Sequence, residues 1–276
     1  ALLSTIFSAQ EKEKSETNEN SDITILFSRP MVALTTLDEL DLKSIPVEII
    51  PKTEGKFKWI STRNLQFIPK ERLQRSSNYT IRVKAGFTSV EGLEIPASEY
   101  HFTVRPLRYA NGENGEKAYN RPYTISFNQE VDLSKTIREI TLFSIEGTKK
   151  ESIPFQAEYG TSQNAAQNKK IIAIYNAKDR HGREKLWDFQ QNYQIVIQKV
   201  YPSEGDIVID KGKTFDFHVR GIINNTYATS ERSNNVTPDF FDPAGKFWIS
   251  FSENVDIEKT KIVGDFITGK GYGEKC

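Results

Sequence analysis

The chain has 276 residues, and its 37 Lys and Arg balance its 37 Asp and Glu, so the formal net charge is zero. This balance argues against nucleic-acid binding, which needs clustered positive charge to replace the counterions on phosphate. No apolar run is long enough to cross a bilayer as a helix, and the lone Cys276 excludes an internal disulfide. With 17 Phe and 11 Tyr, the composition favours the pleated, half-buried surfaces of β-strands.

The first ten residues, ALLSTIFSAQ, are mostly apolar and end in small and polar residues. They fit the trailing part of a secretory signal peptide, and they fit equally well a frayed segment or a strand contributed to a neighbour. Residues 10–22, QEKEKSETNENSD, contain no apolar side chain. We therefore predict a flexible N-terminal segment over residues 1–22, whose charged part can bury nothing.

One pattern occurs three times, as TILFSRPMVAL at 24–34, TISFNQEVDL at 124–133 and WISFSENVDI at 248–257. Apolar residues alternate up to a Phe in each copy, and a period of two predicts a β-strand. A short polar turn follows, and then a further apolar residue, so we predict an edge-like strand that kinks and continues. The Phe residues are Phe27, Phe127 and Phe251, and the later apolar residues are Met31, Val131 and Val255.

Later strands also match between the first two units. NYTIRV at 78–83 parallels NYQIVI at 192–197, and YHFTVRP at 100–106 parallels FDFHVRG at 215–221. Residues 160–170, GTSQNAAQNKK, predict a long hairpin loop. Short helical turns are expected at Thr35–Leu42 and Ser134–Glu139. The expected core residues are Phe27, Trp59, Phe67, Tyr79, Ile81 and Phe102 in the first unit, and Phe127, Tyr193, Ile195 and Phe217 in the second.

These patterns predict an all-β protein of tandem Ig-like or fibronectin-like β-sandwiches. The first sandwich is expected at 23–106 and the second at 107–220. Residues 221–276 would hold a linker and the start of a truncated third β-domain, which begins near Asp239. Turn-rich junctions are expected at 106–119 and 221–238.

Side chains that could carry chemistry are scattered. His101, His181 and His218 lie far apart, the first and last at outward strand positions, so a metal site is not expected. Four aspartates could bind calcium at domain junctions, although helix caps and turns are the commoner use of such residues. They are Asp38, Asp41, Asp239 and Asp242. No nucleophile motif or nucleotide fingerprint is present, so we expect no catalytic, cofactor-binding or metal-binding residue and no enzyme activity.

Three tryptophans, Trp59, Trp187 and Trp248, could form a platform for sugars. Trp59 and Trp248 lie inside alternating apolar runs, so burial in a core is the expected role. Glycosylation sequons occur at Asn78, Asn224 and Asn235, of which Asn78 adjoins a core strand.

The first unit carries a more specific resemblance. Pro30-Met31, the run GKFKWISTRNLQFIP at 55–69, the strand NYTIRV and the turn Ala85-Gly86 resemble the N-terminal macroglobulin-like domains of bacterial alpha-2-macroglobulins. All three units also resemble bacterial Ig-like domains, a pattern common in adhesins. Alpha-2-macroglobulins trap proteases through a bait segment and a Cys-x-Glu-Gln thioester. That motif is absent from this chain, and Cys276 is its last residue, so no trapping residue is carried over.

The resemblance implies the non-catalytic N-terminal domains of an alpha-2-macroglobulin-like protease inhibitor. Such a protein would be extracytoplasmic, whether periplasmic, membrane-anchored, at the cell surface or secreted. Its expected partners are the other domains of the full-length protein, together with proteases or other proteins, and no cofactor, nucleic acid or small-molecule substrate is expected. The alternatives are spacer or ligand-presenting modules of a surface adhesin, and an accessory array on a secreted hydrolase.

Overall fold

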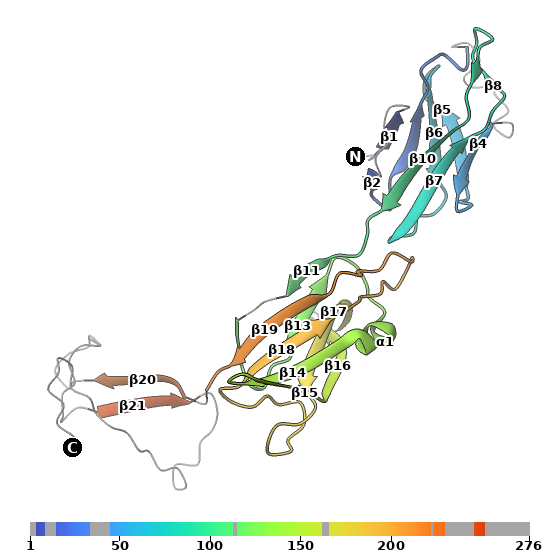
Figure 1. Cartoon of the computed structure of the whole chain (residues 1–276). Helices are drawn as coiled ribbons and strands as arrows, with labels where there is room; N and C mark the ends of the chain where they lie inside the picture. Colours follow the sequence, from blue (N-terminus) through green and yellow to red (C-terminus); the bar gives the residue numbers. More distant parts are fainter. Residues whose placement is uncertain are drawn as a thin grey trace.

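A computed structural model describes residues 4–8, 15–33, 45–112, 115–161, 166–221, 223–229 and 246–251, of which 4–8, 223–229 and 246–251 are described by their backbone alone. The described chain is almost entirely β (Figure 1). Its helical part is one short turn, α1 (Leu133–Thr136), continued by the 3-10 turn η3 (Ile137–Glu139). This turn lies where the sequence predicts one at Ser134–Glu139, and Asp132 caps it by accepting the N–H of Lys135 at 3.2 Å.

Two four-stranded sheets form the first sandwich. One has the order β1 (Ser4–Ser8), β3 (Asp22–Leu26), β6 (Asn64–Pro69) and β5 (Gly55–Trp59). The other has the order β2 (Ser15–Thr17), β10 (Ser98–Val104), β7 (Ser77–Val83) and β4 (Val47–Ile50). A small ribbon of β8 (Phe87–Thr88) and β9 (Glu94–Ile95) packs beside them.

The second sandwich repeats this plan with a four-stranded and a five-stranded sheet. The first sheet has the order β11 (Tyr109–Gly112), β13 (Tyr123–Phe127), β17 (Gln167–Asn176) and β16 (Phe155–Thr161). The second has the order β12 (Gly115–Lys117), β19 (Lys213–Val219), β18 (Asn192–Ile197), β14 (Ile140–Glu146) and β15 (Lys149–Ile153). Beyond it, β20 (Ile223–Thr229) pairs with β21 (Lys246–Phe251).

Each sandwich has its own apolar core, and the predicted core residues are confirmed. All six predicted for the first sandwich and all four predicted for the second are buried. In both sandwiches a Tyr stacks on the Phe opposite it in the next strand, with ring centroids 5.4 Å apart. The pairs are Tyr79–Phe102 and Tyr193–Phe217.

The same tyrosines close matching corners. The Tyr79 hydroxyl accepts the N–H of Gln74 at 3.0 Å, and the Tyr193 hydroxyl accepts the N–H of Asp188 at 3.1 Å. Both acceptors thus reach back five residues, as a tyrosine corner does in Ig-like folds. Three residues before each Tyr the backbone has a positive φ, +50° at Ser76 and +55° at Gln190. The repeat seen in the sequence is therefore a repeat of local geometry as well.

Three expectations about strands are corrected. The strand that opens the repeated sequence pattern is not an edge strand, because β3 lies between β1 and β6 and β13 lies between β11 and β17. The strand also ends rather than continues: Met31 donates its N–H to Thr62 O at 2.7 Å, and Val131 makes an isolated bridge to Pro202. The hairpin at 160–170 is present, but its strands extend through Thr161 and resume at Gln167, so its loop is shorter than expected.

The N-terminal segment is also more ordered than its composition suggests. β2 pairs in parallel with β10, and Glu19 and Ser21 are buried. The expectation that residues 15–22 bury nothing is wrong because backbone pairing and ion pairs, rather than apolar side chains, hold them. Likewise β11 and β12 occupy half of the predicted junction at 106–119, and β20 begins inside the predicted junction at 221–238.

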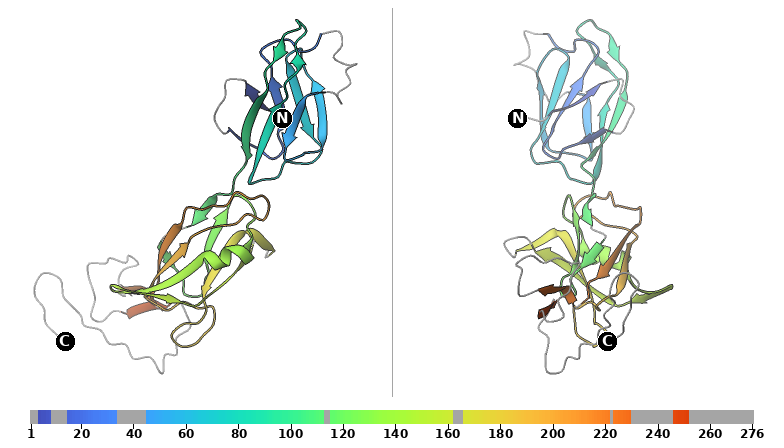
Figure 2. Two further views of the ribbon diagram at one scale, coloured as in Figure 1. Left: turned by 45° about the vertical axis from the view of Figure 1, so that its right-hand side comes forward. Right: turned by 90° about the vertical axis from the view of Figure 1, so that its left-hand side faces the viewer.

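Figure 1 shows the two sandwiches end to end, and the views in Figure 2 agree. The chain passes from β10 to β11 through residues 105–108 alone. This short connection places the tyrosine corner of the first sandwich against the loops of the second.

Candidate functional site

The junction between the sandwiches is built around Ser76, which is fully buried. Its backbone N–H donates to Val104 O at 2.9 Å, which ties it to the last residue of β10. Its hydroxyl oxygen accepts the N–H of Leu107 at 3.0 Å and the side-chain amide of Gln129 at 2.6 Å. One residue of the first sandwich thus holds both the linker and the turn that follows β13.

The loop between β18 and β19 joins the same corner from the other side. Asp206 and Ile207 donate their N–H groups to Ser76 O at 3.0 and 2.8 Å. Gly205 has φ +82°, and a Cβ added there would lie 2.2 Å from Arg75 O and 2.4 Å from Ser76 O. A distance below 3.0 Å to backbone atoms cannot be relieved by a side-chain rotation. The two backbones can therefore approach this closely only because residue 205 is glycine.

Charged groups reinforce the contact. Glu204 accepts two hydrogen bonds from the Arg72 guanidinium, both at 2.7 Å, and the N–H of Arg75 at 3.2 Å. The hydrogen bond from Arg72 is the main cause that lowers the pKa of Glu204, and the pKa of Arg72 is raised in turn. On the far side of the linker, Arg108 makes a two-pronged ion pair with Glu16 of β2. Fork-to-fork pairs of this kind fix orientation as well as adding energy.

Glu19 is the most buried acid at this end of the first sandwich, with a side chain 5% exposed. Burial by itself raises its pKa, but the hydrogen bond from Arg75 and the charge of Arg105 outweigh burial, so the pKa is lowered. Arg105 Nε lies 3.4 Å from the Glu19 carboxylate. Glu19 is therefore held by cations from two segments, which ties the turn before β7 and the linker to the N-terminal segment.

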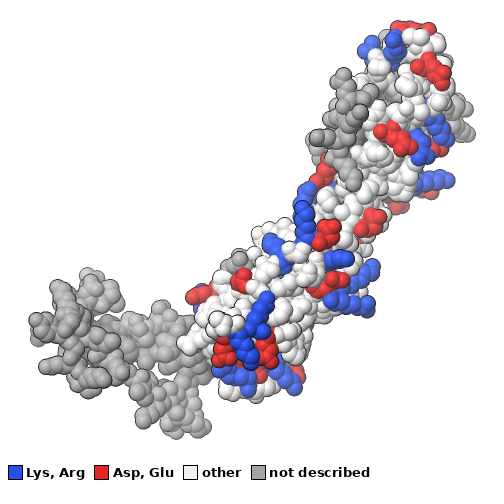
Figure 3. Space-filling view, in the orientation of Figure 1, with Lys and Arg blue, Asp and Glu red and all other residues white. Residues whose placement is uncertain are grey.

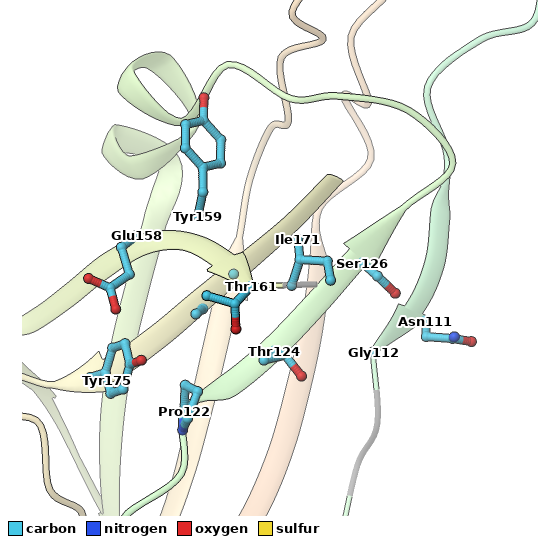
Figure 4. Close-up of a pocket in the computed structure, with 12 residues that line it drawn as sticks. Asn111, Gly112, Pro122, Thr124, Ser126, Glu158, Tyr159, Thr161, Ile171 and Tyr175 are labelled. Atoms are coloured by element: carbon cyan, nitrogen blue, oxygen red, sulfur yellow. The ribbon is translucent and has the colours of Figure 1, made fainter. Parts of the chain in front are cut away.

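A second feature is a hollow of about 390 Å³ on the outer face of the β11-β13-β17-β16 sheet (Figure 4). Thr124, Glu158, Thr161 and Tyr175 are among its lining residues. In Figure 4 the side chain of Tyr159 points away from the hollow, and its hydroxyl bonds Val131 O and Leu133 N instead. The lining combines apolar residues with hydroxyl groups and one carboxylate, that of Glu158.

The predicted roles of the histidines and tryptophans are resolved in part. His101 bonds the hydroxyl of Thr80 and His218 bonds the side chain of Asn192, each at 2.9 Å, on outward strand positions as predicted. Trp59 is buried, so its predicted core role is confirmed. Trp187, for which no core role was predicted, is buried as well, so a sugar platform built on these two residues is excluded. Within the described residues, no group of three or more His, Cys, Asp or Glu could hold a metal ion.

Several residues named from the sequence lie outside the described side chains. They are Asp38, Asp41, Asp239, Asp242, Asn224, Asn235, Trp248 and Cys276. Conversely, the junction residues Glu19, Ser76, Gln129, Glu204 and Gly205 were not singled out from the sequence. The available signal was the pair SSNY and QQNY before the late strands, which marks two equivalent corners.

Charge is distributed without a dominant sign. On the face shown in Figure 3, acidic and basic side chains alternate over both sandwiches. No helix in the described part of the chain is long and apolar enough to span a membrane.

Residues 5–104 match the family described as bacterial Ig-like domain. The match begins within β1, so it includes the segment expected from composition to be a tether. The chain is also 25% identical over 111 residues to a protein of Yersinia pestis described as an alpha-2-macroglobulin homolog. That alignment covers 38% of this chain and 6% of the Yersinia protein.

Among solved structures, L,D-transpeptidase 3 from Mycobacterium tuberculosis aligns at 14% identity with a TM-score of 0.24, over 54% of this chain and 60% of that one. The S-layer protein SbsC aligns at 15% identity with a TM-score of 0.23, over 82% of this chain and 28% of that one. Scores this low carry no argument about function. The family match over residues 5–104 and the two-sheet structure agree on an Ig-like β-sandwich fold for this part of the chain.

Proposed function

We propose that the chain is a rod of tandem, non-catalytic Ig-like modules that holds the rest of a longer bacterial protein at a set distance and angle. The observation that carries the proposal is the junction at Ser76, where hydrogen bonds join the first sandwich to the linker and to two loops of the second sandwich. Domains within a chain move relative to each other by default unless their interface is extensive. Here a short linker, a close backbone approach at Gly205 and a charged clamp at Glu204 act on one corner.

The second tyrosine corner supports extending the rod. Gln190 donates its N–H to Val219 O at 3.0 Å, as Ser76 does to Val104 O. A Cβ added at Gly221 would lie 3.0 Å from the Gln190 side-chain amide, so the outgoing chain passes close to this corner. β20 begins at Ile223, immediately beyond. We expect the next module to dock on this corner as the second sandwich docks on the first.

For the whole protein, we propose an extracytoplasmic alpha-2-macroglobulin-like protease trap in which these modules lie near the N-terminus. The support is the identity with the Yersinia pestis homolog over 111 residues, together with the Ig-like domain at 5–104. The alternative is an adhesin, in which the modules present a ligand-binding surface. The hollow on the second sandwich favours that alternative, and a Cys-x-Glu-Gln motif in the full-length protein would favour the first.

Small-angle X-ray scattering of the chain tests the rod. The wild type should give a scattering curve fitted by one extended conformation of the two sandwiches. The double variant Gln129→Ala/Glu204→Ala should need an ensemble that includes bent conformations. Glu151→Ala is the matched control, because it removes an acid whose ion pair with Lys149, 3.0 Å long, lies within a single hairpin. A wild type that already needs a broad ensemble would overturn the proposal.

A second experiment tests the protease trap in the full-length protein. Incubation with an endoprotease should leave activity on small peptide substrates while activity on large proteins is lost. If the full-length protein has no effect on either activity, the trapping role is wrong, whereas the rod would still stand on its scattering.

A further inference from the structure

The hollow on the second sandwich has a regular layout that follows from strand register. Along β17, the hollow-lining residues Ile171, Ala173 and Tyr175 alternate with the core residues Ile172 and Ile174, and of the three lining residues Ala173 is itself only 3% exposed. The first three therefore form a stripe on the outer face of the sheet. At about 3.3 Å per residue the stripe runs for about 13 Å. This stripe is the apolar floor of the hollow.

Small residues make this surface concave. Ala173 is at the centre of the stripe, and Gly160 lies beside Ile171, whose Cγ2 atom would be 2.5 Å from a Cβ added at residue 160. The edge strands β16 and β11 each carry a register shift next to the hollow, at Tyr159/Gly160 and at Tyr109/Asn111. Bulges bend and twist a strand and are frequent beside binding sites. The hollow of about 390 Å³ lies within the usual range for ligand pockets.

Polar side chains flank the floor in register. Across the sheet, Thr124 is paired with Ala173, which is paired with Glu158. In the next outward-facing row, Asn111 is paired with Ser126, which is paired with Ile171. The first row therefore has an apolar centre between two polar side chains, and the second has two polar side chains on one side of Ile171.

Hydrogen-bonding capacity remains open on these walls. The hydroxyls of Thr124 and Ser126 make no hydrogen bond with other described residues. A hydroxyl both donates and accepts. Thr124 lies on β13 and Thr161 on β16, the two strands that flank β17. The walls therefore offer paired donor and acceptor groups.

The charge at the hollow is already neutralised. Glu158, the one charged side chain in the described lining, pairs with Lys185 at 2.9 Å. The Lys185 ammonium lies 4.8 Å from the centre of the Tyr175 ring and covers one face of that ring. A phosphate or carboxylate would find no unpaired cation in this lining, and an ammonium ligand would have to displace Lys185. The hollow thus selects for an uncharged ligand.

We propose that the hollow binds an uncharged oligosaccharide lying along β17, with one sugar ring against Tyr175. A pyranose ring presents C–H groups on its faces and hydroxyls around its edge, which matches an apolar floor between hydroxyl-bearing walls. Tyrosine is suited to such a contact, since its ring is apolar and its hydroxyl is polar. This activity goes beyond the rod and departs from the expectation of no small-molecule partner.

A peptide pairing with the sheet fits less well. Such a peptide would add to an edge, using the open backbone groups of β11 or β16. The hollow is centred instead on β17, whose backbone is paired on both sides. Side chains, rather than backbone groups, are what it presents.

The test uses the ¹⁵N-labelled 276-residue chain, titrated in turn with cellohexaose, maltohexaose and chitohexaose. At least one sugar should give saturable shifts grouped on β13, β16 and β17. The Tyr175→Ala variant should weaken binding about tenfold or more. The Thr124→Ala/Ser126→Ala variant should weaken it roughly three- to tenfold for each lost hydrogen bond. Thr141→Ala is the matched control, since Thr141 is on β14 in the opposite sheet, and it should bind as the wild type does.

A third variant separates binding from folding. Ala173→Phe should fill the floor and abolish binding, while its circular dichroism spectrum stays that of the wild type. The proposal is overturned if none of the three sugars gives saturable shifts, or if Tyr175→Ala, whose side chain is only partly buried, binds unchanged. Shifts confined to the edge strands β11 and β16 would indicate strand pairing and would also overturn it. None of these outcomes bears on the rigidity of the rod.

Discussion

Replacing Gly205 by Ala should open the junction without unfolding either sandwich. An L-residue at φ +82° costs about 1–2 kcal/mol. The new Cβ would lie 2.2 Å from Arg75 O, and backing away would break the bonds from Asp206 and Ile207 to Ser76 O, at about 1 kcal/mol each. The clamp at Glu204 is partly solvent-exposed and adds little more. The total is about 3–4 kcal/mol.

Gly182→Ala provides the matched control for this variant. Gly182 has φ +77° in the same sandwich, but nothing lies within 4 Å of a Cβ placed there. It therefore carries the backbone strain without the collision. ¹⁵N relaxation should show both sandwiches tumbling together in the wild type and in Gly182→Ala. In Gly205→Ala each sandwich should tumble faster and with its own correlation time. If Gly205→Ala tumbles like the wild type, the junction does not depend on this backbone approach.

Four further outcomes are expected. Because the pKa of Glu204 is lowered by Arg72, the contribution of Glu204 to the rigidity of the junction should be complete above the ordinary glutamate pKa of about 4.3 and should be lost as the pH falls below that value. An acid titration of the correlation times of the two sandwiches checks this. Phe27→Ala and Phe127→Ala should each cost about 3–5 kcal/mol in thermal melts, and unchanged melts would mean a wrong register. Tyr193→Phe should cost about 1 kcal/mol by loss of the corner hydrogen bond, with denaturant midpoints as the readout. The isolated chain should form no covalent adduct with a panel of proteases, as checked by denaturing electrophoresis.

The core of both sandwiches was predictable because alternation fixes which side chains face inward. Phe27, Tyr79 and Phe102 follow from period two and from the matched NYTIRV and NYQIVI strands. The position of a strand within its sheet does not follow from that period. β13 lies inside its sheet because the short strand β11, in a stretch rich in Gly and Asn, pairs with it. Side-chain pattern is weak in such short strands, so the sequence suggested a junction there.

The junction itself could not be predicted, because its contacts involve residues far apart in the sequence. Glu204 and Arg72 are separated by 132 positions, and neither differs in type from the other charged residues. The burial of Glu19 depends on Arg75 and Arg105, which reach it only after the sheets have formed. Polar composition alone therefore predicted a tether where the fold places a buried ion pair.

The central claim is that the two sandwiches form one rigid unit. A Cys276→Ser chain with spin labels at Lys58→Cys and Gln167→Cys, both exposed strand positions in different sandwiches, reports the distance between them by pulsed electron resonance. A second pair within the first sandwich, Lys58→Cys with Thr88→Cys, gives the width due to the labels themselves. The account predicts a single inter-sandwich distance as narrow as this control. A distribution several times broader than the control would contradict it.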